Sequence, residues 1–200
     1  MANKKEVKPK VILALAVQDT VKSKLLLSLL TALRGADFDY DVAVSMGCDL
    51  IGSRTRLVNM AKKMNGTHIL FIDHDMFLNP TILSDGTKES PIATLLKRDK
   101  DIIAAPYNFR SLPLKSTATP VSDVFETQPY PCHALGTGFM LVKMSVFDKI
   151  EKPWFQFGRN AEAELVYGED TWLCQQAIKA GLGVFAEPTV NIKHVGDYDF

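Results

Sequence analysis

Continuous apolar runs alternate with amphipathic stretches in the first half of the chain, and this order limits the folds that it can adopt. Residues 11–17 are all apolar, as in a strand that is covered on both faces. Apolar residues then recur every four positions from Val21 to Leu33, which predicts a helix that ends at Gly35.

The same alternation continues to residue 105. Strands are expected at residues 40–46, 67–72 and 101–105, with a helix before each of the last two. The helix before residue 101 begins at Ser90-Pro91, a favourable helix start. Alternation of this kind predicts an α/β protein with a parallel, doubly wound sheet through residue 105.

The pattern changes after residue 105. Residues 106–131 contain five prolines and little periodicity, which predicts a long functional loop or lid. A glycine turn into a strand is expected at residues 136–143, and a helix over residues 170–180. A length of 200 residues suits one domain with a full core. We therefore predict a single domain over residues 11–200 after a flexible start at residues 1–10.

Composition excludes several classes of protein. Lys+Arg and Asp+Glu number 23 each, so the chain has no overall positive field to attract nucleic acid. The apolar run at residues 11–17 is too short to span a membrane, and no signal-peptide pattern is present. Three widely spaced cysteines indicate neither a zinc site nor a disulfide framework. These features predict a cytoplasmic protein with reduced thiols and no membrane association.

The strand expected at residues 67–72 runs directly into two carboxylates, Asp73 and Asp75. In an extended chain both point to the same side. They would stand past the carboxyl end of a buried strand, where open α/β sheets bind ligands. Adjacent carboxylates repel each other, so a divalent cation is a natural partner. Taken alone, the same pattern also fits a solvated turn.

Two further motifs suit a phosphorylated ligand. Arg54 and Arg56 lie at the start of an expected helix, where free N–H groups favour a phosphate, although plain surface arginines explain them equally well. The glycines of Gly136-Thr137-Gly138 let a backbone approach a ligand closely. A tight turn before a strand is the alternative.

The last two motifs carry acid, base or metal-binding groups. Glu169 and Asp170 begin an expected helix, where they either cap it or provide a general base. His194 ends an expected strand and is either structural or a ligand. Together with Asp73 and Asp75 it makes an oxygen and nitrogen set that suits Mn²⁺.

In this order, the motifs resemble those of the GT-A glycosyltransferases, especially the family 2-like nucleotide-sugar transferases. The resemblance covers residues 11–195, and its most specific segments are residues 70–76, 136–142 and 167–173. It implies a single-domain GT-A fold, α/β with a Rossmann-related, mostly parallel sheet and helices on both faces.

The resemblance also implies a metal-dependent glycosyltransferase of the hexosyltransferase type. It would move a sugar from a nucleoside-diphosphate sugar, a UDP-sugar first of all, to an acceptor hydroxyl. Asp75 and His194 would bind Mn²⁺ or Mg²⁺, and Asp73 would contact the ribose or the metal's water shell. Asp170 would be the base, with Glu169 beside it. Donor contacts are implied for Val17, Gln18, Asp19, Asp49, Arg54, Arg56, Asp73, His74, Gly136, Thr137 and Gly138.

Two features depart from the family pattern. Residues 16–19 lack the proline and aromatic residue that are common in the family's first loop. His74, between the two acids, either reaches the ligand or points away from it.

The motifs do not identify the acceptor molecule. Compact members of this kind resemble bacteriophage enzymes, some of which glycosylate modified bases in DNA. Such DNA is one acceptor class, in the host cytoplasm if the protein is viral. Residues 106–131, residues 154–166 or a second subunit would hold it. Two alternatives remain: a nucleotidyltransferase, which usually has a glycine-rich basic loop after its first strand, and a non-catalytic module that binds sugar nucleotides.

Overall fold

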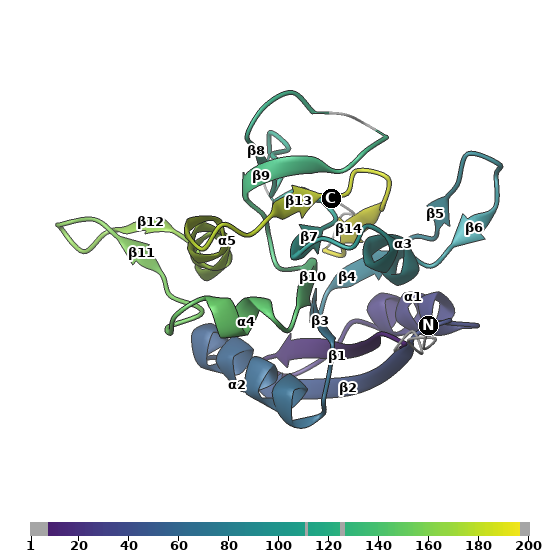
Figure 1. The fold of residues 1–200 in the computed structure, drawn as a ribbon, viewed down its shortest axis with the longest axis horizontal. Helices are drawn as coiled ribbons and strands as arrows, with labels where there is room; N and C mark the ends of the chain where they lie inside the picture. Colours follow the sequence, from purple (N-terminus) through teal and green to yellow (C-terminus); the bar gives the residue numbers. More distant parts are fainter. Residues whose placement is uncertain (1–7, 111, 125–126, 197–200) are drawn as a thin grey trace, which may run out of the picture.

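An eight-stranded sheet runs through the computed structural model, which describes residues 8–110, 112–124 and 127–196 (Figure 1). Across the sheet, the strands are β2 (Asp39–Met46), β1 (Lys10–Val17), β3 (His68–Asp73), β10 (Phe139–Lys143), β7 (Ile102–Ala104), β13 (Val184–Ala186), β9 (Tyr130–Ala134) and β8 (Thr119–Pro120). Six of these strands share one direction, and β10 and β9 run against it. The prediction of a mostly parallel sheet is confirmed.

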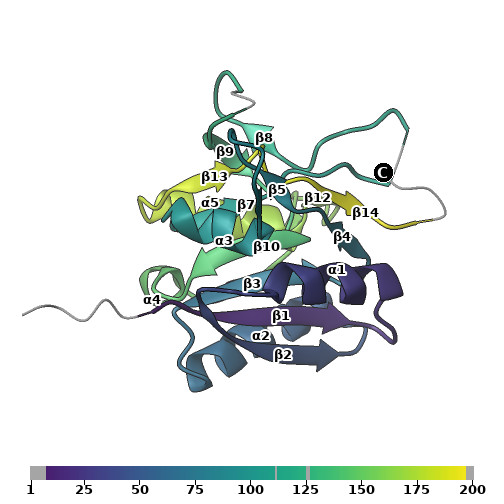
Figure 2. The same ribbon diagram turned by 90° about the vertical axis from the view of Figure 1, so that its right-hand side faces the viewer.

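Helices cover both faces of this sheet (Figures 1 and 2). On one face lie α1 (Ser23–Leu33) and α3 (Pro91–Lys97); on the other lie α2 (Leu50–Lys63), α4 (Val146–Lys149) and α5 (Glu169–Lys179). Side chains of β1 alternate between two apolar cores, with Leu13 in the α1 core and Ile12 in the α2 core. This alternation explains why the whole run is apolar, and it confirms the expected fold class.

Three short strand pairs lie outside the large sheet. They are β4 (Met76–Leu78) with β14 (Ile192–His194), β5 (Thr81–Ile82) with β6 (Lys88–Glu89), and β11 (Gly158–Arg159) with β12 (Leu165–Tyr167). Most of these strands were not predicted, because two or three residues are too few to show a periodicity. No helix in the described ranges is long and apolar enough to cross a membrane.

One prediction about the elements was wrong. The first helix begins at Ser23, so Val21 lies before it and is exposed. Residues 106–131 contain β8 and the start of β9, and their role as a functional loop or lid stays a prediction. Strand β7 runs parallel to β3 but is separated from it by the antiparallel β10, whose place was not predicted. An apolar run shows that a strand is buried but not which neighbour it has. Of the flexible start expected at residues 1–10, residues 1–7 lie outside the described residues and Lys10 belongs to β1.

The insertion of β10 brings the turn before it to the carboxyl end of β3. The backbone N–H of Asp73 donates to the carbonyl of Gly138 at 3.1 Å. The buried ring of Tyr107 packs against this turn, and its hydroxyl accepts a hydrogen bond from the Gly138 N–H at 2.9 Å. A Cβ atom at Gly138 would lie 2.6 Å from that hydroxyl oxygen. Glycine is therefore required here by packing.

We predict that Gly138→Ala lowers the free energy of unfolding by about 1–3 kcal/mol, because the added methyl group overpacks the site. In a Tyr107→Ala background the same change should cost much less, since the ring that it meets is gone. Urea unfolding of the four proteins in this cycle measures both values. Equal costs in the two backgrounds would contradict the proposed contact.

Candidate functional site

A cleft of about 310 Å³ opens at the carboxyl ends of β1, β2 and β3. This is the edge at which open α/β sheets bind ligands. Several predicted site residues line it together: Val17, Gln18, Arg54, Asp73, His74, Asp75 and His194. Arg110 and Cys48 line it as well.

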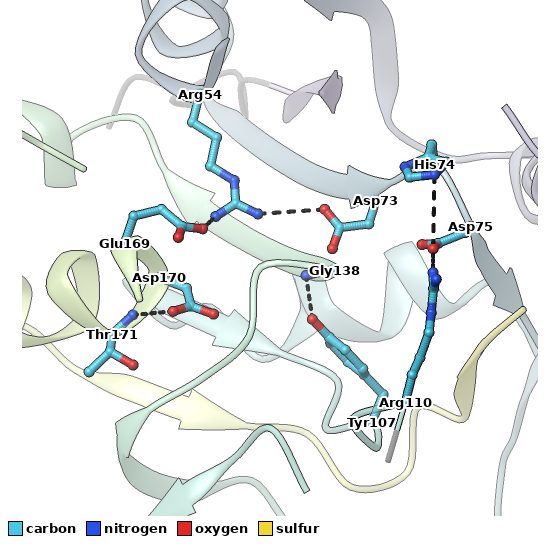
Figure 3. A network of polar contacts seen from close by, with 10 residues as sticks. All are labelled: Arg54, Asp73, His74, Asp75, Tyr107, Arg110, Gly138, Glu169, Asp170 and Thr171. Atoms are coloured by element: carbon cyan, nitrogen blue, oxygen red, sulfur yellow. Dashed lines mark hydrogen bonds and ion pairs between the residues drawn. The ribbon is translucent and has the colours of Figure 1, made fainter. Parts of the chain in front are cut away.

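Arg54 is the central charge beside this cleft (Figure 3). It lies in the first turns of α2 and is only 4 % exposed. Its guanidinium lies 3.5 Å from an Asp73 carboxylate oxygen and forms a second ion pair with Glu169. Glu169 is buried too. Since a buried charge is costly unless it is paired, these two carboxylates are what makes the buried arginine tolerable.

Asp170 lies next to Glu169 at the start of α5, on the same side of Arg54 (Figure 3). Burial raises the pKa of its carboxyl group, and the charge of Asp73 raises it further. The Thr171 N–H, which donates to Asp170 at 2.7 Å, and the charge of Arg54 act in the opposite direction. A carboxyl group with a raised pKa is suited to accept a proton near neutral pH.

Asp75 has a different partner. It is 3 % exposed and forms an ion pair with Arg110. The Nε2 atom of His74 lies 4.0 Å from the same carboxylate, so His74 points toward the cleft. The two acids of the motif are therefore bound by two different arginines.

Arg110 lies on a segment that folds back on itself between Tyr107 and Thr117. The Thr117 N–H donates to the Tyr107 carbonyl at 2.8 Å, and the Phe109 N–H donates to the Lys115 carbonyl at 2.9 Å. The side chain of Arg110 is 44 % exposed. Unlike Arg54, it can leave its carboxylate partner without being buried alone.

His194 reaches the cleft from β14, and its ring packs edge-on against Tyr107 with centroids 4.7 Å apart. Its Nδ1 atom lies 2.8 Å from the Asn108 carbonyl oxygen. A carbonyl only accepts, so Nδ1 carries the hydrogen. Burial lowers the pKa of the ring, and nearby Arg110 lowers it further. The neutral ring thus has its free lone pair on Nε2, the form in which histidine binds metals.

The described residues contain no preformed metal site with three protein ligands of this kind. No group of three His, Cys, Asp or Glu side chains that could hold a metal occurs in the part of the chain that the structure describes. Asp75 and His194 nevertheless provide a carboxylate oxygen and an imidazole nitrogen on one cleft. These suit a Mn²⁺ or Mg²⁺ ion that takes its remaining ligands from phosphate and water. Arg110 would then have to release Asp75.

The remaining predicted donor contacts do not line the cleft. The Asp49 carboxylate accepts from the Gly52 N–H at 2.9 Å and so caps α2. Arg56 donates to Ser45 and Ser53. Asp19 is exposed in the loop after β1, and the turn of residues 136–138 is buried. Their roles in donor binding stay predictions.

Sequence reasoning missed Arg110 and Tyr107 as parts of the site. The proline-rich stretch indicated a lid, but nothing in it distinguished one basic residue from the next. Tyr107 had no motif of its own.

Comparisons with known proteins identify the fold. No family model and no curated protein matches the chain. Among solved structures, A197 from STIV aligns with a TM-score of 0.65 and 16 % identity, over 94 % of this chain and 86 % of that one. GalNAc-T7, solved with UDP, GalNAc and Mn²⁺, aligns with a TM-score of 0.55 and 11 % identity. This second match covers 96 % of this chain and 44 % of that one, so the chain spans less than half of it. The chain has a GT-A-like fold.

We predict that Arg54→Ala lowers the free energy of unfolding by about 3–5 kcal/mol, because it leaves Glu169 buried and unpaired. The matched control is Arg56→Ala, two residues along the same helix. Its side chain is 52 % exposed and contacts two serines, so the cost should be about 1 kcal/mol. Urea unfolding measures both. Similar costs for the two arginines would contradict this interpretation of Arg54.

We also predict that Asp170→Asn stabilises the protein at neutral pH. The raised pKa means that the folded state favours the protonated carboxyl group. Its contribution to stability is present below the unfolded-state pKa of about 3.9 and is lost as the pH rises through the folded-state pKa. Asparagine avoids this loss. Denaturant unfolding from acidic to neutral pH should therefore show a growing advantage of the variant, whereas parallel profiles would count against it.

Proposed function

We propose that this protein is a metal-dependent glycosyltransferase that uses a nucleoside-diphosphate sugar, with a UDP-sugar as the first candidate. One observation carries the proposal. In a GT-A-like fold, the acids Asp73 and Asp75 line a cleft at the carboxyl edge of the sheet, and a carboxyl group with a raised pKa, Asp170, lies across the buried Arg54 from Asp73.

The leaving group in such a reaction is a nucleoside diphosphate, which gains negative charge as the bond to the sugar breaks. A bound divalent ion would supply positive charge for these oxygens. Asp75 and His194 are the residues that would hold it. Asp73, which is paired with Arg54, would contact the ribose or the metal's water shell, and residues 17 and 18 line the same cleft. Arg110, half exposed on the same cleft, would add a positive charge for the diphosphate.

Asp170 has the properties of a base for the acceptor hydroxyl. In an inverting transfer, the acceptor oxygen attacks the anomeric carbon, the bond to the diphosphate breaks, and the hydroxyl proton passes to the Asp170 carboxylate. The raised pKa makes this carboxylate a better proton acceptor than an exposed aspartate. Glu169 is held by Arg54, so it serves to position the helix start rather than to accept the proton.

The ion pair between Arg110 and Asp75 favours one alternative, a module that binds sugar nucleotides without metal or turnover. In such a module Arg110 would permanently replace the metal as the partner of Asp75. Modified DNA, as acceptor in a host cytoplasm, remains an expectation from resemblance alone. A donor screen by mass spectrometry with Mn²⁺ against sugars, peptides and hydroxymethylated DNA tests the acceptor.

We predict that Mn²⁺ and UDP together raise the melting temperature of the wild type. Asp75→Ala should weaken binding of UDP in the presence of Mn²⁺ by about 10- to 100-fold, since an interaction with a charged group is worth about 1.5–3 kcal/mol. Asp85→Ala is the control, because Asp85 lies in an exposed turn between β5 and β6. Calorimetric titration measures the affinities. If the wild type binds neither ligand, the glycosyltransferase proposal fails.

Two further variants separate enzyme from module. Arg110→Ala frees Asp75, so the enzyme should bind Mn²⁺ more tightly without UDP, whereas a module should gain nothing. Asp170→Asn should keep UDP binding but lose release of nucleoside diphosphate from the donor. Donor binding without any such release in the wild type would favour the module.

A further inference from the structure

An apolar surface lies at the far edge of the sheet, where β2 pairs with β1 on one side and has no strand on its outer side among the described residues. It consists of Tyr40, Val42, Val44 and Met46 of β2 and of Leu26 and Leu30 of α1, and we call it the β2–α1 surface. These six side chains are between 45 and 65 % exposed. The four β2 side chains alternate along the strand and so share one face of it. Monomeric proteins rarely expose large contiguous apolar groups.

The position of α1 explains why this surface is open. The register of β1 with β2 places Val42 beside Leu13 and Val44 beside Leu15, on the face that α1 covers. Yet α1 lies over β1 and β3 and leaves β2 bare (Figures 1 and 2). Ser28 of α1 accepts from the Leu78 N–H of β4. On the flank of α1 opposite Ser28 lie Leu26 and Leu30, and both are exposed.

The edge strand has few of the usual protections against pairing. All eight residues of β2 keep regular register with β1, so no bulge interrupts it. It contains neither lysine nor proline. Its two acids, Asp39 and Asp41, are paired with Lys8 at 3.2 Å and Lys10 at 2.7 Å. The strand thus offers unpaired backbone groups, an apolar face and little net charge to a partner strand.

We propose that β2 pairs antiparallel with β2 of a second copy of this chain, giving a two-fold dimer with one continuous sheet. The sequence suits this partner. When the pairing is centred on Ala43, Val42 lies opposite Val44 and Tyr40 lies opposite Met46. Asp41 then faces Ser45, so no acid meets an acid. The same patch serves both copies, as a two-fold interface requires.

This dimer does not depend on the proposed function. Antiparallel pairing places the two clefts at opposite ends of the joined sheet, because each cleft lies at the carboxyl end of its strands. Both stay open. In each copy the interface ends at Met46, one residue before Gly47 at the edge of the cleft.

Size-exclusion chromatography with light scattering, at micromolar protein concentrations, should give the mass of two chains for the wild type. Val44→Lys puts a lysine from each copy into the apolar interface and should raise the dimer dissociation constant by about 100-fold or more. Val166→Lys is the matched control, because Val166 is a strand valine of β12 that is also exposed, and it should leave the dimer intact. Circular dichroism checks that each variant is folded.

The register has its own test. In the double variant Val42→Glu with Val44→Lys, each new lysine would face a new glutamate of the other copy, so the dimer should return. A wild type that stays monomeric at every concentration overturns the proposal and leaves this surface to a different partner. A dimer that survives Val44→Lys overturns it as well. If the double variant stays monomeric, the pairing centred on Ala43 is wrong.

Discussion

A buried guanidinium is tolerated only where carboxylates neutralise it, and the site is arranged around the one at Arg54. Its two partners come from distant parts of the chain, Asp73 at the end of β3 and Glu169 at the start of α5. These elements and α2 must therefore meet at one point, and they do so at the carboxyl edge of the sheet. The donor side and the acceptor side of the proposed reaction are joined by a single side chain.

Asp75, the second acid of the motif, has a more exposed partner than Asp73 does. Asp75 is paired with Arg110, which is half exposed on a segment outside the large sheet. In the ion pair of Arg54 with Glu169 both partners are buried, whereas in this one the arginine is half exposed and only the carboxylate of Asp75 is buried. His194 connects β14 to the segment that carries Arg110. Its backbone belongs to β14, while its ring packs against Tyr107 and hydrogen-bonds to the Asn108 carbonyl.

The sequence allowed the fold class to be predicted, since β1 and β3 are apolar throughout and the helices between them carry clear stripes. It also placed Asp73, Asp75 and His194 on one cleft. Three features could not be predicted from the sequence. The direction and place of β10 depend on a partner far along the chain. The local partners of Asp49 and Arg56, a helix N-terminus and a pair of serines, were not predicted either. Arg110 has no pattern that marks it, because its role comes from where its segment folds.

The place of β10 has a consequence for synthesis of the chain. Strand β3 is complete at Asp73, but the strand that pairs with its other side begins only at Phe139. At about 5–20 residues per second, the ribosome needs several seconds to make the stretch between them. During that time the nascent chain holds an apolar strand with one unpaired edge. Folding of the N-terminal half is thus unfinished until β10 has been made.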